Sequence, residues 1–209
     1  MSSSILKNLA LLVLIGVVAY NSVYVKKLDE VKKAISSNLG QAFNAATYAE
    51  TFWTNKLIPA TQQSATDFTT LMTLLKTDKE KAMSTYSHAL GIGNIRYFLV
   101  KGEGTITAIS DEDITVLLPD GESVKLTTEY IFGNAVRDAS GLIQITEFDN
   151  TMDLNNVSAE INDIIRRKVI PGLKNRAKKE DKVSFVGAIE LNREHLHLDN
   201  LEVIPITVK

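Results

Sequence analysis

The chain begins with a strongly apolar run. Residues 9–20 read LALLVLIGVVAY and contain no charge. A spanning helix needs roughly 20 apolar residues, and a buried helix at the edge of a core normally carries a polar stripe, which this run lacks. The pattern is typical of a signal peptide or a short anchor. We therefore expect residues 1–25 to form an uncleaved membrane-anchor helix, with cleavage after Ala19 as the alternative.

Residues 26–94 show helical spacing and form a predicted helical section. One stripe follows Asp67, which suits an N-cap, and consists of Phe68, Leu71, Met72 and Leu75. An earlier helix that carries Ala49 and Trp53 is expected to end at residues 58–59, because proline disfavours helix in the residue before it. Residues 77–80 have the spacing of a capping box that starts at Thr77.

From Arg96 onward the apolar period changes from about 3.6 to 2, which predicts strands. Glycines at 102 and 104 indicate a bend between the first two strands, and Pro119-Asp120-Gly121 indicates a hairpin turn. The predicted strands are 97–101, 105–109, 114–118, 123–127, 142–148, 183–191 and 201–208.

A helix is expected within this strand-rich part. Its apolar face runs from Val157 to Val169, and it is expected to end before Pro171. The order of elements predicts an α+β protein in which residues 95–209 form a small OB-like β-barrel with an inserted helix. A β-sandwich is the alternative. The helical section is expected to pack on the barrel as one unit.

Composition narrows the possible chemistry. The 209 residues include no cysteine, which excludes disulfides, thiolate metal sites and a cysteine nucleophile. The net charge is -2, but residues 103–153 hold eleven acidic side chains against two basic ones. An acidic barrel repels a phosphate backbone, so no nucleic-acid partner is expected. The basic stretch 163–182 is interpreted as a solvated helix end, with contact to an anionic membrane surface as the alternative.

Metal and catalytic motifs are weak. His195 and His197 would share one side of a strand, but a zinc site needs a third ligand, and only His88 remains. The acidic runs 111–113 and 149–155 lack the ladder that surrounds calcium. No nucleophile elbow, phosphate loop or dinucleotide fingerprint occurs. We therefore expect no cofactor, metal or catalytic residue.

The segment 132–143 is the most unusual in the chain. It places Arg137 and Asp138 among small residues directly after Asn134. Small neighbours allow close approach, so this pair can either bind a polar ligand such as a sugar or stabilise its own loop. The candidate binding residues are Lys101, Glu103, Asn134, Arg137 and Asp138.

Four segments in order resemble a known family. They are Trp53 with 56–59, then 97–104, 134–143 and 183–189. Together they resemble the bacterial domain of unknown function 2291, predicted periplasmic lipoproteins. The resemblance implies a membrane-attached protein on the periplasmic face with an OB-like barrel, and an association with sugar importers of the ATP-binding-cassette type. Many relatives carry a lipid-bearing cysteine after the leader, and this chain does not.

These observations favour a non-catalytic, membrane-anchored envelope protein that binds a solute or serves as an accessory component of a sugar importer. The alternative is an envelope hydrolase that uses carboxylates such as Asp138 or Glu103. The oligomeric state is not predicted.

Overall fold

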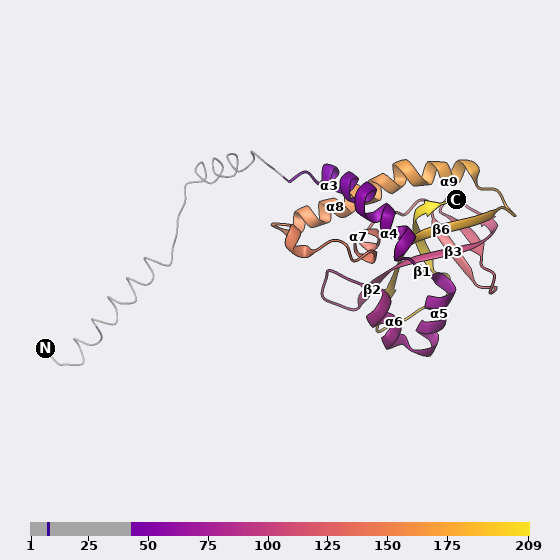
Figure 1. The fold of residues 1–209 in the computed structure, drawn as a ribbon, viewed down its shortest axis with the longest axis horizontal. Coiled ribbons are helices and arrows are strands. Elements are labelled where there is room, and N and C mark those ends of the chain that lie inside the picture. The colour runs from indigo at the N-terminus through magenta and orange to yellow at the C-terminus, as the bar shows by residue number, and fades with distance from the viewer. Residues whose placement is uncertain (1–7, 9–42) are drawn as a thin grey trace. The chain divides into compact units, whose positions relative to one another are not determined.

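The computed structural model describes Asn8 and residues 43–209 (Figure 1). The predicted anchor helix, apart from Asn8, and the start of the helical section lie outside the described residues. Among the residues that are described, no helix is both long and apolar enough to cross a bilayer. Residues 44–209 make up a single unit.

Five strands close into a barrel. They are β3 (Ile95–Ile109), β4 (Asp113–Leu117), β5 (Ser123–Thr127), β6 (Lys182–Asn192) and β7 (Glu202–Val208). Their order is β3-β4-β5-β7-β6, and pairing of β3 with β6 closes the ring. Only the pairing of β5 with β7 is parallel among these five. This confirms the predicted α+β fold with an OB-like barrel.

Strand β3 is one long strand, whereas the sequence predicted two. Residues 95–105 pair with β6, and the end from Thr105 pairs with β4. A Cβ on Gly102 would lie 2.7 Å from the Phe185 ring, and one on Gly104 would overlap the carbonyl of Leu117. The glycines therefore let the strand pass close to both neighbours without breaking it.

Two long helical segments continue through proline, which corrects the predicted ends at Pro59 and Pro171. One consists of α3 (Ala45–Phe52), a π turn (Trp53–Leu57) and α4 (Ile58–Gln63). The other consists of α8 (Thr151–Ile164), a π turn (Ile165–Val169) and α9 (Ile170–Arg176). In both, the residue before proline donates its N–H across the π turn, and the proline occupies the first turn of the next helix, where its missing N–H costs little.

The predicted helix 68–75 is confirmed as α5 (Phe68–Thr77), and Asp67 caps it. The capping box predicted at Thr77 is wrong, because Asp78 is the N-cap of α6 (Lys79–Tyr86) and accepts from Lys81 N. Two-residue strands, β1 (Thr66–Asp67) and β2 (Ser87–His88), flank these helices and pair with β3.

The strand predicted at 142–148 is also wrong. Residues 142–148 contain only a 3-10 turn (Ile145–Glu147), and a short helix, α7 (Ala135–Ala139), precedes them. Ile143 is buried while Leu142 and Ile145 are exposed. Because β5 already pairs with β4 and β7, the closed barrel offers this segment no free strand edge.

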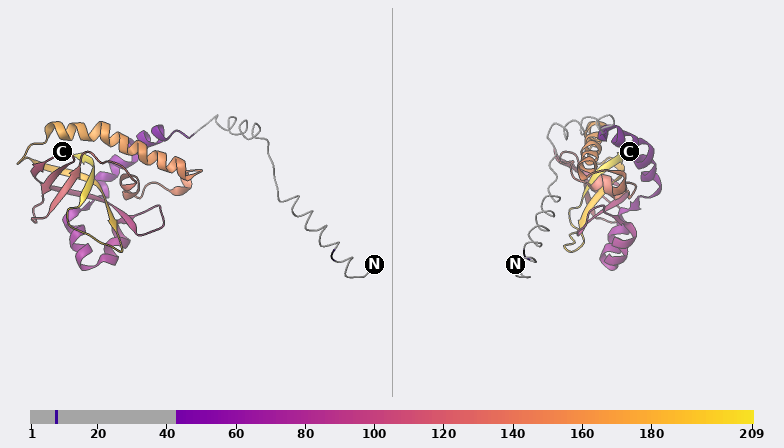
Figure 2. Two further views of the ribbon diagram at one scale, coloured as in Figure 1. Left: turned by 180° about the vertical axis from the view of Figure 1, so that it is seen from behind. Right: turned by 90° about the vertical axis from the view of Figure 1, so that its left-hand side faces the viewer.

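The apolar side chains form two clusters. The first fills the barrel and includes Phe98, Phe185 and side chains from α5 and α6. The second lies between the outer face of β3 and β6 and the helices α3, α7 and α8. Figures 1 and 2 show the long α8–α9 segment on one side of the barrel and α5 with α6 on another.

Candidate functional site

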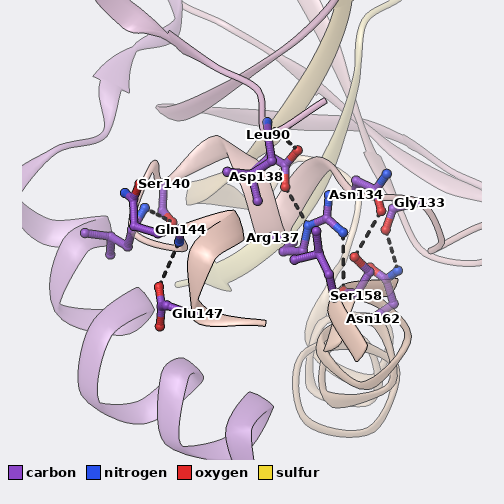
Figure 3. A network of polar contacts seen from close by, with 12 residues as sticks. Leu90, Gly133, Asn134, Arg137, Asp138, Ser140, Gln144, Glu147, Ser158 and Asn162 are labelled. Atoms are coloured by element: carbon purple, nitrogen blue, oxygen red, sulfur yellow. Dashed lines mark hydrogen bonds and ion pairs between the residues drawn. The ribbon is translucent and has the colours of Figure 1, made fainter. Parts of the chain in front are cut away.

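The two residues of the predicted Arg-Asp pair contact each other inside the protein. Arg137 and Asp138 lie in α7 and are 4% and 3% exposed. Arg137 Nε lies 2.6 Å from Asp138 Oδ1, and Arg137 Nη1 donates to the carbonyl of Leu154 at 3.3 Å. Leu90 N donates to Asp138 Oδ2 at 3.2 Å. The pair therefore connects α7 to α8 and to the segment after β2 (Figure 3).

Asn134 belongs to the same network. Ser158 Oγ donates to Asn134 Oδ1 at 3.0 Å, and Asn162 Nδ2 donates to the carbonyl of Gly133 at 2.9 Å (Figure 3). In the described part of the chain, every buried side-chain nitrogen and oxygen has a partner. The network is therefore internally satisfied, and its geometry is that of a buried structural cluster that holds the helices together.

The structure places Lys101 and Glu103 elsewhere, on the barrel. They are two residues apart on β3, both exposed, and therefore on the same side of the strand. A hollow of about 670 Å³ opens beside them. Its lining residues are Ile58, Thr61, Gln62, Asp67, Lys101, Gly102, Glu103, Ser184, Phe185, Val186, Thr207 and Lys209.

A second hollow, of about 590 Å³, adjoins the first. Both are lined by Glu103, Ser184 and Lys209, and we call the two together the Glu103 groove. The second hollow adds Gly104, Thr105, Leu117, Leu118, Pro119, Lys182 and Val183. The register of β3 against β6, which sets Glu103 opposite Ser184 and Thr105 opposite Lys182, assembles this groove from two distant parts of the chain.

The groove carries charged side chains of both signs that take part in no ion pair among the described residues. Among the described residues, Lys101, Glu103 and Lys182 form no ion pair within 4.0 Å. Asp67 differs, because its Oδ1 accepts from Thr70 N at 2.8 Å and from Thr70 Oγ1 at 2.9 Å. The Asp67 carboxylate thus caps α5, whereas Lys101 and Glu103 can contact a ligand.

Lys101 and Glu103 were expected from the sequence, whereas the groove residues Lys182, Ser184 and Lys209 were not. The only signal for them is strand pairing, which a sequence does not show directly. His195 and His197 lie in the loop between β6 and β7 rather than on a strand. Within residues 43–209, no three His, Asp or Glu side chains converge in a way that could hold a metal ion.

Comparison with known proteins gives the family. The model of a family described as "Predicted periplasmic lipoprotein (DUF2291)" matches residues 13–209. The chain belongs to this family. The resemblance predicted from four segments is thereby confirmed. Because the chain contains no cysteine, none of its 209 residues can carry the cysteine-linked lipid that the family description implies.

A solved structure shows the same fold. An OB-fold protein from Thermotoga maritima is similar with a TM-score of 0.70 and 24% sequence identity, over 80% of this chain and 98% of that one. At this identity the likeness concerns the fold alone. No curated protein matches the chain.

Proposed function

We propose that this protein is a non-catalytic binding component of the cell envelope that holds a small polar solute in the Glu103 groove. The observation that carries the proposal is the position of Lys101 and Glu103, which lie unpaired and exposed beside a hollow of about 670 Å³. Hollows of roughly 300–1,000 Å³ are the usual size for small-molecule sites.

The chemistry of the groove favours a neutral, hydroxyl-rich ligand such as a sugar. Lys101 offers donors, and the carboxylate of Glu103 offers acceptors. A hydroxyl group both donates and accepts, so one ligand can satisfy the two side chains together. The Ser184 hydroxyl adds a third polar group between the two hollows. Charges of both signs in one groove give no advantage to a strongly charged solute.

We propose attachment to the periplasmic face of the inner membrane through the N-terminal apolar run. The membership in a family of predicted periplasmic lipoproteins supports the compartment. The absence of cysteine supports an anchor made of protein rather than lipid, because residues 9–20 are the apolar run available for it.

A solute-binding protein held at this membrane has the properties expected of an accessory component of a sugar importer of the ATP-binding-cassette type. This partner is part of the proposal. The argument for it is that the polar groups of the groove suit a sugar. An importer needs its solute concentrated near the membrane, which an anchored binding protein achieves.

The hydrolase alternative has less support. Asp67 and Glu103 line the same hollow, which is the arrangement that acid-base hydrolysis would use. However, Asp67 caps α5, and Asp138 is buried against Arg137. Neither aspartate is available as the second carboxylate, so binding without catalysis accounts better for the geometry.

The test is a calorimetric titration of the full chain in detergent with a panel of monosaccharides and disaccharides. We expect at least one sugar to bind, and Lys101→Ala and Glu103→Gln to weaken its binding about tenfold each. Lys179→Ala and Asp149→Asn are matched controls, since both side chains are exposed and outside the groove. Wild-type sugar affinity in Glu103→Gln, or no sugar binding by the wild type, would contradict the proposal.

A further inference from the structure

A third hollow, separate from the Glu103 groove, lies beside the loop between β6 and β7. It measures about 480 Å³. Its walls come from the end of β5, the segment 130–135, the strands β6 and β7, and the loop that joins them. The side chains that matter for its chemistry are Tyr130, Phe132, Glu190, Asp199 and Glu202.

Two aromatic side chains stand unusually open at this hollow. Tyr130 is 58% exposed and Phe132 is 70% exposed. Phenylalanine is ordinarily among the most buried residues, so an open phenyl ring at the edge of a cavity indicates a contact surface. Tyr130 Oη donates to Glu112 Oε1 at 3.4 Å, which holds the tyrosine at the rim.

Acidic side chains outnumber basic ones in the hollow. Glu190, Asp199 and Glu202 contribute carboxylates, His195 and His197 contribute imidazoles, and no lysine or arginine is among its lining residues. Within the part of the chain that the structure describes, none of these three carboxylates forms an ion pair.

The basic side chain next to Glu202 in the sheet already has an acidic partner. Lys125 is the ladder neighbour of Glu202, but its Nζ lies 2.9 Å from Asp113 Oδ2. Glu190 is the partner of Tyr97 across the β3–β6 ladder, so a neutral phenol rather than a cation lies beside it. Partial burial raises the pKa of Glu190, as expected for a carboxylate with no positive charge beside it.

We infer that this hollow binds a small organic cation, such as a primary or quaternary ammonium group. The open faces of Phe132 and Tyr130 attract a cation through their ring quadrupoles, and the carboxylates supply the countercharge. A metal ion is the poorer fit, because the described His, Asp and Glu side chains do not converge on one point. This site is independent of the proposed sugar groove, since the two share no lining residue.

The experiment uses choline chloride as the probe, titrated into the full chain in detergent, with sodium chloride at matched ionic strength as the reference. We expect millimolar or tighter binding by calorimetry, together with NMR shift changes at Phe132 and His195. Phe132→Ala and Glu190→Gln should each weaken choline binding about fivefold.

Matched control variants separate the site from the general surface. Met152→Ala removes a side chain that is 71% exposed, close to the value for Phe132, and Glu122→Gln removes an exposed carboxylate. Neither residue lines the hollow. We expect wild-type choline affinity in both. The proposal is overturned if choline does not bind, if Phe132→Ala and Glu190→Gln bind it as the wild type does, or if zinc or calcium displaces it at micromolar concentration. If Glu190→Gln still binds a sugar with wild-type affinity, the proposed function does not depend on this cation site.

Discussion

Arg137 and Asp138 are consecutive residues of one short helix, and yet their side chains form a buried ion pair of 2.6 Å. Successive helical positions normally point in directions about 100° apart. The pair is held because the other atoms of both groups contact separate parts of the chain, the carbonyl of Leu154 and the amide of Leu90.

Removing one partner leaves the other charge buried. We expect Arg137→Met to lower the free energy of unfolding by about 3 kcal/mol, because Asp138 then lacks its countercharge. The double variant Arg137→Met with Asp138→Asn should be more stable than Arg137→Met alone. Urea denaturation followed by circular dichroism measures both. A loss below about 1 kcal/mol in the single variant would contradict a structural role for the pair.

Gly141 has a left-handed conformation, with φ at 66°, and contacts the ring of His88. A Cβ at this position would lie 2.5 Å from that ring. We expect Gly141→Ala to destabilise the protein by about 2 kcal/mol, the sum of backbone strain and steric overlap.

Variants at two other glycines distinguish backbone strain from steric overlap, and thermal unfolding measures the differences. Gly133 has φ at 82° and open space around it, so Gly133→Ala should cost only about 1 kcal/mol of backbone strain. Gly91 has neither feature, and Gly91→Ala should change stability by less than about 0.5 kcal/mol. Equal losses in all three variants would refute this interpretation.

Glu147 is expected to make stability depend on pH. Burial by itself would raise the pKa of this carboxyl, but hydrogen bonds from Gln144 N and Tyr48 Oη, together with nearby Lys56, lower it below its usual range. A lowered pKa in the folded state gives stability that is fully present above the unfolded pKa and is lost as pH falls through the folded pKa.

We therefore expect the melting temperature of the wild type to fall more steeply than that of Glu147→Gln as the pH is lowered below about 4.5. Melting curves of the two proteins from acid to neutral pH measure the difference. Parallel curves would show that the ionisation of Glu147 does not contribute to stability.

Glu190 is expected to have the opposite effect on the pH dependence of stability. Because burial raises the pKa of this carboxyl, its ionised form destabilises the fold, and the penalty grows as pH rises from the unfolded pKa through the folded pKa. We expect Glu190→Gln to have a higher melting temperature than the wild type at pH 7 and a similar one under acid conditions. A lower melting temperature at pH 7 would mean that Glu190 serves the fold rather than a ligand.

The barrel could be predicted from the sequence because its signals are local. The Asp120-Gly121 turn and the alternating runs on either side of it gave β4 and β5 directly. The parallel pairing of β5 with β7 joins Leu126 to Val203, and no local pattern reveals a contact over that separation. The π turns were also missed, because a proline at 59 or 171 ordinarily ends a helix.

The candidate site residues also differed in how far the sequence could predict them. The unusual composition around Arg137 drew attention to a segment that forms a buried network, but the sequence left ligand binding and a structural loop both open. Small residues serve close packing of α7 as well as they would serve a ligand. Lys101 and Glu103 were recognisable as polar residues on a strand. Lys182, which completes the Glu103 groove, is brought there only by the register of β6 against β3.

The proposed function depends on the Glu103 groove, and it is tested by comparing sugar binding to the wild type and to Glu103→Gln. Calorimetry of the full chain should detect one sugar that binds to the wild type and binds about tenfold more weakly to Glu103→Gln, with Asp149→Asn unchanged. If Glu103→Gln bound the sugar with wild-type affinity, or if no sugar bound to any of the three proteins, the groove would not be a sugar site.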